Sequence, residues 1–335
     1  MSNQHTSEIV GVGPVVRDMT VQVPKGAVSV GSKIDCVIQD SSGGGSLNGV
    51  RQVKRLGGNA TGVFLVGQDE DGPAVEAMVR REFPGSRVVP CLSGTRRSVV
   101  LDGRVHTVRT RTKSLLPTDA ISVIADAKLT LMAPMAKEDH PFVRQVLDAA
   151  PRVVLQLSAQ QVQDADAASQ LAEDAWLTVI NDAELHAWTG LADPVSGVQS
   201  LREHGVSNIL VTSKRGVLGF VDSNWVAIPS FQTTMVKNTV AAGDVLVGTL
   251  AAALVEGHSW KHAIRLGLAA AALHVEGNAA GGDWQALESV LRQRPAISGS
   301  QRVTRSASRL RQQVTGAAVT ACLLIGISLG LMWWM

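Results

Sequence analysis

A short run of small residues followed by an acid is the most informative feature of the sequence. Asn238-Thr-Val-Ala-Ala-Gly-Asp244 leads directly into the apolar residues 245–254. If residues 245–254 form a helix, the N–H groups of Ala241, Ala242 and Gly243 converge at its N-terminus, an arrangement that binds anions without any side chain. Amides that stabilise phosphate charge, beside a carboxylate that accepts a proton, suit phosphoryl transfer. The alternative is that Asp244 is an ordinary acid at a helix N-terminus.

Other signatures of nucleotide or metal binding are incomplete. Gly11-Val-Gly13 follows an apolar run, but Val16 stands where a dinucleotide fingerprint has its third glycine, and no P-loop G-K-[ST] occurs. The eight histidines show no metal spacing, and the three cysteines lie far apart without a C-x-x-C pair. The sequence therefore argues against a Rossmann cofactor site, a Walker-type nucleotide site, a zinc site and a disulfide framework.

The body of the chain alternates between apolar runs of strand length and stretches of helical periodicity. The helical pattern is present at residues 73–83, 140–150 and 195–204. The apolar runs of strand length lie at residues 9–16, 63–66, 129–132, 153–157, 177–180 and 209–212. Strands separated by helices predict a doubly wound, mainly parallel α/β sheet that is covered by helices on both faces.

Two segments break this alternation. Residues 19–39 and 98–111 alternate apolar and polar side chains, which is typical of strands with one solvated face. We expect extra antiparallel strands outside the main sheet, approximately within 19–42 and 96–112, and interpret them as a small β lid. Three basic residues of this lid could face an anionic substrate, although a solvated strand face is the simpler interpretation: Arg104, Arg109 and Arg111.

The C-terminal part of the sequence differs from the body. No acidic residue follows Glu288, whereas six arginines do, and residues 314–335 carry no charge. Without those arginines the remainder is mildly acidic, which argues against a nucleic-acid-binding surface. As a helix of about 33 Å, residues 314–335 would match the hydrocarbon core of a membrane, with Trp333 and Trp334 at its interface. The alternative is a buried terminal helix.

We therefore expect three parts: a folded domain at 1–290, a basic linker at 291–313 and a transmembrane tail anchor at 314–335. The arginine-rich flank predicts that the folded domain faces the cytoplasm. Gly326 and Gly330 form a G-x-x-x-G pattern that lets two membrane helices approach closely, so a homodimer is a further expectation.

Five motifs, in the same order along the chain, resemble the pfkB carbohydrate kinases, a family that includes ribokinases, fructokinases and adenosine kinases. The second signature of that family has the form D-T-x-G-A-G-D, and residues 238–244 read N-T-V-A-A-G-D. The other matching runs begin at Gly13, Gly43, Arg55 and Asn181. They are Gly13-Pro-Val-Val-Arg-Asp18, Gly43-Gly-Gly-Ser-Leu-Asn48, Arg55-Leu-Gly57 with Val66-Gly-Gln-Asp69 and Gly72, and Asn181-Asp-Ala-Glu184. The resemblance covers roughly residues 9–283.

The resemblance implies a catalytic and a substrate-binding set. Asp244 would be the general base, and the N–H groups of Ala241, Ala242 and Gly243 would form the anion hole. Asp18, expected at the end of the first strand, would accept hydrogen bonds from substrate hydroxyls, which charged acceptors bind strongly when water is excluded. The other substrate-binding residues implied are Gly43, Gly44, Gly45 and Asn48, because glycines allow close backbone approach and an asparagine both donates and accepts.

The resemblance also implies a nucleotide-binding set. Asn181 and Glu184, which share a helix face, would help to hold Mg²⁺ and the phosphates, largely through water. The alternative is that this pair is a helix cap with an exposed acid. The remaining nucleotide or phosphate contacts implied are Thr212, Ser213, Gly216 and Asn278. The implied cofactors are ATP and Mg²⁺, with a monovalent cation left open.

Three positions depart from the family pattern. Asn238 replaces an aspartate, Ser213 replaces a glycine near the adenine site, and Ala241 replaces the first glycine of the anion cradle, which is tolerable only if φ is negative there. The expected activity is transfer of the ATP γ-phosphoryl group to a hydroxyl of a sugar or sugar-like molecule. The alternatives are a nucleoside kinase on the same fold and a membrane-tethered nucleotide- or sugar-binding protein with weakened activity.

Overall fold

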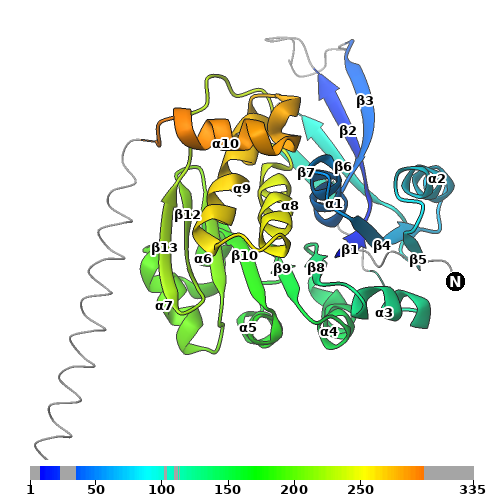
Figure 1. Ribbon diagram of the computed structural model, residues 1–335. Coiled ribbons are helices and arrows are strands. Elements are labelled where there is room, and N and C mark those ends of the chain that lie inside the picture. The colour runs from blue at the N-terminus through cyan, green and yellow to red at the C-terminus, as the bar shows by residue number, and fades with distance from the viewer. Residues whose placement is uncertain (1–7, 23–34, 102–103, 109–111, 113, 298–335) are drawn as a thin grey trace, which may run out of the picture.

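The strands form two separate sheets in the computed structural model, which describes residues 8–22, 35–101, 104–108, 112 and 114–297. The main sheet has nine strands (Figure 1). In spatial order they are β13 (Asn224–Pro229), β12 (Gly216–Val221), β11 (Ile209–Ser213), β10 (Leu177–Asn181), β9 (Val153–Gln156), β8 (Leu129–Met132), β1 (Ile9–Pro14), β4 (Ala60–Gly67) and β5 (Arg87–Cys91).

The main sheet is parallel except at one edge. The pairings from β11 through β10, β9, β8, β1 and β4 to β5 are all parallel, whereas β12 and β13 add an antiparallel hairpin. Every residue of β1 and of β4 is buried, as expected for parallel strands with helices on both faces. The predicted mainly parallel α/β sheet is confirmed.

Helices cover the two faces of the main sheet in separate layers, each with its own apolar cluster. One layer contains α1 (Gly45–Arg55), α2 (Gly72–Glu82), α8 (Ala242–Val255), α9 (Trp260–Val275) and α10 (Trp284–Gln293). The other contains α3 (Thr118–Ala125), α4 (His140–Ala149), α5 (Ala165–Asp174), α6 (Asp182–Thr189) and α7 (Pro194–Glu203). Two short 3₁₀ turns are η1 (Lys137–Asp139) and η2 (Ala279–Gly282).

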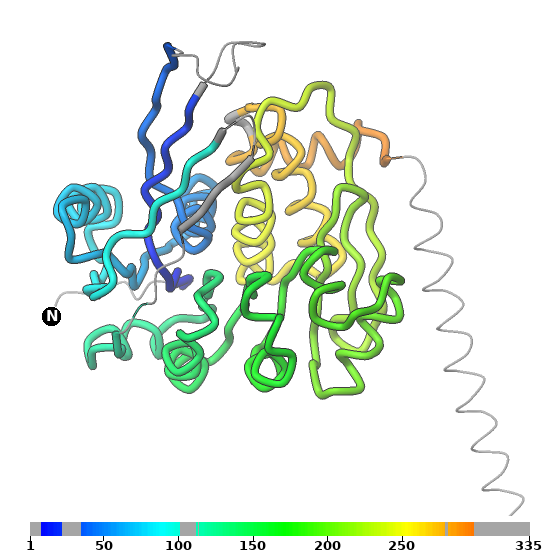
Figure 2. The backbone as a smooth tube through the Cα atoms, turned by 180° about the vertical axis from the view of Figure 1, so that it is seen from behind, coloured from blue at the N-terminus to red at the C-terminus, as the bar shows by residue number. Residues whose placement is uncertain are grey.

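The second sheet lies where extra strands were expected, and its order is β3-β2-β6-β7. Its strands are β2 (Val16–Gln22), β3 (Val37–Gly43), β6 (Arg96–Leu101) and β7 (Arg104–Val108). The expectation of purely antiparallel strands is wrong, because β2 and β6 pair in parallel and thereby join two antiparallel hairpins. Only Val15 separates β1 from β2, so the chain passes directly from the main sheet into the second sheet, whose β2 and β3 extend away from the helices (Figure 2).

The C-terminal boundary of the body differs from the expected one at residue 290. Helix α10 continues to Gln293, and Arg294 donates a hydrogen bond of 2.8 Å to Glu276 at the end of α9. Ala296 forms a β-bridge with Phe231. The body therefore includes the first residues of the predicted linker. The predicted membrane span at 314–335 lies outside the described residues, and no helix within the described part is long and apolar enough to cross a membrane.

Candidate active site

Asp244 occupies the first turn of α8, as the sequence predicted. Its Oδ2 atom accepts a hydrogen bond of 2.9 Å from Nδ2 of Asn48, which lies in the first turn of α1. The side chain of Gln156, the last residue of β9, also hydrogen-bonds to this carboxylate. Part of the residue reaches solvent, but the carboxylate itself is enclosed. Burial therefore raises the pKa of Asp244, while the bonds from Asn48 and Gln156 and the charge of His274 act against that rise.

Three consecutive glycines allow α1 to begin against this carboxylate. Gly44 has a φ of 111°, and a Cβ atom there would also collide with the carbonyl oxygen of Pro14. A Cβ atom on Gly45 would stand 3.2 Å from Oδ1 of Asp244, tighter than an ordinary contact. A Cβ atom on Gly43 would overlap Oδ2 of Asp18. The glycines thus bring two carboxylates, one from β2 and one from α8, to the start of α1.

Asp18 lies within β2 of the second sheet, so its expected place at the end of the first strand is wrong. The parallel register with β6 sets it beside Ser98. Burial raises the pKa of Asp18, the Ser98 hydroxyl and Arg51 lower it, and the negative charge of Asp244 raises it further. The two carboxylates therefore belong to one electrostatic environment. The structure brings the predicted catalytic acid and the predicted substrate-binding residues together.

The small-residue loop before α8 has a different conformation from the expected one. Ala241 has φ 64° and ψ 6°, in the left-handed region, although the sequence argument required a negative φ. That conformation costs a residue with a Cβ atom about 1 kcal/mol. The N–H of Ala242 donates a long bond of 3.4 Å to the Thr239 carbonyl. Gly243 is exposed, and a Cβ atom there would meet nothing within 4 Å, so the backbone is open to a ligand on that side.

Asn181 and Glu184 form a capping box at the start of α6. Oδ1 of Asn181 accepts a 2.9 Å bond from the N–H of Glu184, and Oε2 of Glu184 accepts a 2.8 Å bond from the N–H of Asn181. Both residues therefore form the helix cap that the sequence left open as the alternative. Within the described residues, no group of three or more histidine, cysteine or carboxylate side chains could hold a metal ion.

The hairpin of β11 and β12 carries the other residues of the predicted nucleotide set. Oγ1 of Thr212 donates to the Ile180 carbonyl over 3.3 Å, and Oγ of Ser213 donates to the Gly216 carbonyl over 3.2 Å. Gly216 has a φ of 136°, and a Cβ atom there would collide with the carbonyl oxygen of Ile228. This glycine is therefore required by the hairpin itself.

A cavity of about 500 Å³ adjoins this hairpin. Ser213 and Gly216 line it together with Lys214, Arg215 and apolar side chains of α6 and β13, whereas Thr212, Asn278, Asp18 and Asp244 do not. Asn278 is exposed after α9, next to Gly277, which approaches Lys237 in the loop before α8. The nucleotide set is therefore distributed over the ends of β10, β11 and α9, and not gathered in one cavity.

Gln156, which hydrogen-bonds directly to the catalytic candidate, was not among the residues predicted from the sequence. Its position was visible as the end of an apolar run of strand length, and side chains at the carboxyl ends of parallel strands meet at one edge of a sheet. A lone glutamine carries no motif, so only the three-dimensional arrangement identifies it. The register of β9 with β10 also places Gln156 beside Val179, two residues before Asn181.

Comparison with known proteins gives relatives that share the family signature and the fold. The profile described as pfkB family carbohydrate kinase matches residues 113–286. The 1-phosphofructokinases of Escherichia coli K12 and Shigella flexneri are each 34% identical over 107 residues, which is 30% of this chain and 34% of the relative. The chain thus spans about a third of the length of these curated relatives.

Solved structures resemble the chain over most of its length. Ribokinase from Arabidopsis thaliana, complexed with ribose and ATP, has a TM-score of 0.65 at 18% identity, covering 86% of this chain and 99% of that one. Phosphofructokinase-2 from Escherichia coli, in complex with fructose-6-phosphate, has a TM-score of 0.66 at 19% identity, covering 85% and 100%. At these identities the likeness establishes a shared fold.

Proposed function

Because the chain belongs to the pfkB family of carbohydrate kinases, we propose that it transfers the γ-phosphoryl group of ATP to a hydroxyl of a sugar or sugar-like molecule. The observation that carries this proposal is the meeting of Asp18, Asn48 and Asp244 at the start of α1. Two carboxylates and an amide around one space provide acceptors for several hydroxyls and one base for the hydroxyl that reacts. The ribose and fructose-6-phosphate complexes named above support a sugar as the acceptor.

In the proposed reaction Asp244 accepts the proton of the acceptor hydroxyl. The hydroxyl oxygen forms a bond to the γ-phosphorus, and the bond from that phosphorus to the β,γ-bridging oxygen breaks, so that ADP leaves with the electron pair. The N–H groups of Ala241 and Gly243 stabilise the negative charge on the migrating group. The N–H of Ala242, which was predicted to act with them, is bonded to the Thr239 carbonyl. A raised pKa makes the Asp244 carboxylate a stronger base than an ordinary aspartate, provided that it is ionised.

The nucleotide would lie along the carboxyl edge of the main sheet. Adjacent strands are about 4.8 Å apart, so β11 and β12 lie roughly 10–14 Å from β9, where Gln156 meets Asp244. A nucleoside triphosphate with its γ-phosphate at Asp244 would extend over this distance towards Ser213 and Gly216. Lys214 and Arg215, which line the adjoining cavity, would attract its negative charge.

Magnesium fits this arrangement only as an ion held mainly by phosphates and water. The carboxylate of Glu184 already accepts the N–H of Asn181, and the described residues offer no ready cage of carboxylates. Mg²⁺ keeps several of its waters, so Glu184 would act on them from outside the first shell of ligands. When bound, the ion would neutralise charge on the β- and γ-phosphates.

The test is ADP release by the full chain with ATP, Mg²⁺ and a panel of free sugars, sugar phosphates and nucleosides. We expect turnover with at least one sugar, and a loss of at least 1,000-fold in kcat for Asp244→Asn. Asp148→Asn makes the same chemical change on an exposed part of α4 and serves as control. Turnover with nucleosides alone would favour the nucleoside kinase. Tight ATP binding with no ADP from any acceptor would favour the binding protein.

Three finer proposals concern the surroundings of the enzyme. The uncharged residues 314–335 behind an arginine-rich flank support attachment to a membrane, with the folded body in the cytoplasm. Fractionation of cells that express the chain with and without these residues tests this.

The exposed Val37 and Ile38 on edge strand β3 support a homodimer, which sedimentation of residues 1–313 tests. Turnover in potassium compared with tetramethylammonium tests a monovalent-cation requirement.

A further inference from the structure

A histidine at the end of α9 is bonded to the loop that leads into α8. Nε2 of His274 lies 2.7 Å from the carbonyl oxygen of Val240. A carbonyl oxygen can only accept, so Nε2 carries a hydrogen and donates it. His274 is half-buried in the last turn of α9, and neither its spacing nor its surroundings in the sequence marked it.

The acceptor of this bond is one end of the peptide unit that supplies the anion cradle. The carbonyl of Val240 and the N–H of Ala241 belong to the same planar, trans peptide, so they point in opposite directions. An imidazole that holds the carbonyl on the side of α9 therefore turns the N–H of Ala241 away from α9. Ala241 has a left-handed conformation and is followed by the right-handed residues of α8, and successive N–H groups in such a pair of conformations can bind an anion together.

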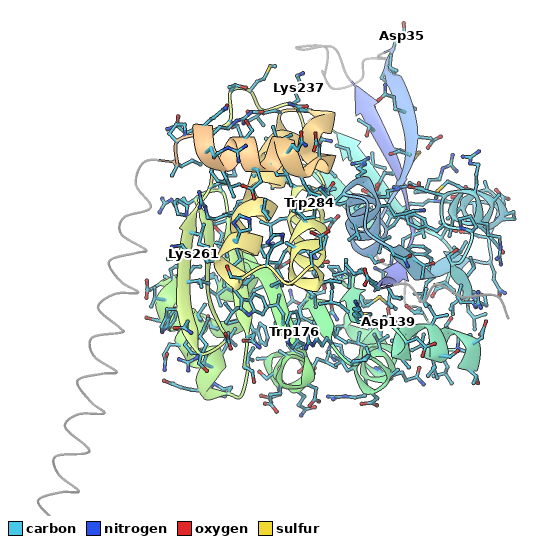
Figure 3. The ribbon with its side chains drawn as sticks, in the orientation of Figure 1. Asp35, Asp139, Trp176, Lys237, Lys261 and Trp284 are labelled. Carbon is cyan, nitrogen blue, oxygen red and sulfur yellow. The ribbon has the colours of Figure 1, made fainter. Side chains whose placement is uncertain are left out.

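The same turn of α9 holds the rest of the loop. The carbonyl of Val275 accepts 2.8 Å and 3.1 Å bonds from the N–H groups of Lys237, labelled in Figure 3, and Asn238. Oδ1 of Asn238 in turn accepts a 2.9 Å bond from the N–H of Val240. Both polar groups of Val240 are thus bonded, its N–H by Asn238 and its carbonyl by His274. Two fixed groups leave the following peptide little freedom, which keeps Ala241 in a conformation that an alanine does not favour.

His274 also lies within electrostatic range of the proposed base. Its charge acts on Asp244 in the direction that favours the ionised carboxylate. The other groups that face this carboxylate are Asn48 from α1, Gln156 from β9 and, more remotely, Asp18 from β2. His274 is the basic side chain among them, and it comes from α9, whose last turn is hydrogen-bonded to the loop before α8.

We propose that His274 is a positioning residue for phosphoryl transfer: its bond to the Val240 carbonyl orients the Ala241 N–H towards the migrating phosphoryl group. The inference rests on the proposed function, because the cradle has a use only if phosphate charge develops there. A purely structural role would stabilise α9 and its loop without a selective effect on the chemical step. The positioning role predicts that loss of the His274 N–H donor lowers kcat. The purely structural role predicts that the same loss lowers stability and leaves the chemical step unchanged.

The experiment compares His274→Leu, His274→Gln and His262→Leu in the full chain. His274→Leu removes the donor, whereas His274→Gln retains an N–H that can reach the same carbonyl. His262→Leu is the matched control, because it removes a histidine bond of 2.9 Å to Glu288 from the first part of the same helix. If His274→Leu does not fold, His274→Asn, whose shorter side chain falls short of the carbonyl, takes its place.

We expect His274→Leu to lower kcat by about 10- to 100-fold, with the KM for the acceptor changed less than about threefold. This loss is smaller than the roughly 100- to 1,000-fold that follows outright removal of a donor at a developing charge, because the Ala241 N–H remains and loses only its orientation. His274→Gln should recover at least a third of the parental kcat, and His262→Leu should retain it. A parental kcat in His274→Leu, or equal losses in the leucine and glutamine variants at equal thermal stability, would overturn the inference while leaving the kinase intact. A parent that turns over no acceptor would overturn the proposed function and this inference with it.

Discussion

Nδ2 of Asn48 and Oδ2 of Asp244 are joined by a hydrogen bond of 2.9 Å that connects the first turns of α1 and α8. The bond is possible because the two helices pack unusually closely. A Cβ atom on Gly248 of α8 would collide with the carbonyl oxygen of Gly49 in α1, so the backbones are nearly in contact. The distance between Asn48, proposed to bind the substrate, and the proposed base is therefore set by the spacing of two helices.

Gly248→Ala tests this spacing. The added methyl group must push α8 away from α1, which costs about 1–3 kcal/mol of the free energy of unfolding and separates Asn48 from Asp244. We expect a lower melting temperature and a lower kcat. Gly85→Ala is the control, because a Cβ atom there would meet only the Thr61 hydroxyl at 3.7 Å. A Gly248→Ala enzyme with parental kcat would show that helix spacing does not set the geometry of the site.

Gln156→Leu tests the second bond to the base. The amide of Gln156 lowers the pKa of Asp244 against the effect of burial, so its loss should raise that pKa. Asp244 acts as a base only when ionised, and kcat/KM therefore falls as the pH drops through its pKa. We expect the acidic limb of the kcat/KM profile to move to higher pH. Gln160→Leu, on an exposed residue nearby, should leave the limb in place. If the acidic limb of Gln156→Leu coincides with that of the parent, Gln156 does not affect the pKa of the catalytic base.

Asp244→Asn should stabilise the protein at neutral pH while abolishing turnover. The pKa of Asp244 is higher in the folded than in the unfolded chain, so its contribution to stability is fully present below the unfolded pKa. That contribution is lost as the pH rises through the folded pKa. We expect the variant to melt a few degrees above the parent at pH 8 and the difference to vanish near pH 4. A variant less stable than the parent at pH 8 would show that the ionised Asp244 carboxylate does not destabilise the folded protein.

Glu276→Gln should have the opposite pH dependence. Despite some cost of burial, bonds from Arg294 and Thr234 lower the pKa of Glu276, so its stabilising contribution is present above the unfolded pKa and is lost as the pH falls through the folded one. We expect a loss of about 1–3 kcal/mol at pH 7 that shrinks on acidification. Chemical denaturation at several pH values measures it. Equal losses at pH 7 and at pH 4 would point to packing as the cause.

Regular periodicity made the sheet predictable, since buried parallel strands such as β1 and β4 appear in the sequence as apolar runs. The motif around Asp244 and the glycines at 43–45 follow no parallel strand of this sheet, so only the family resemblance indicated that they belong to one site. What the sequence could not supply was side-chain geometry. The N-x-x-E spacing left a helix cap open as an alternative for Asn181 and Glu184, but their reciprocal hydrogen bonds are seen only in the structure.

Contacts between segments distant in the chain were equally hidden. Gln156 reaches Asp244, and His274 reaches Val240, only because β9 and α9 converge on the head of α8. Neither residue belongs to a local pattern, so no spacing in the sequence indicates its role. The parallel pairing of β2 with β6 was not predicted, because the alternation of apolar and polar residues is the same in parallel and antiparallel strands.

Ala241→Gly tests whether the left-handed conformation before α8 is imposed on the chain by its neighbours. At φ 64° an alanine bears a steric cost of about 1 kcal/mol that glycine does not, whereas glycine loses more entropy on folding by about 0.5–1 kcal/mol. The two effects nearly cancel, so we expect the free energy of unfolding to change by less than about 0.5 kcal/mol. Ala187→Gly, at an exposed position inside α6 with ordinary helical geometry, lacks the compensating gain and should cost about 1 kcal/mol. Urea denaturation of both variants measures the contrast. Equal losses at the two positions would mean that Ala241 is not strained in solution, and that the bonds from His274 and Asn238 do not hold the loop as described.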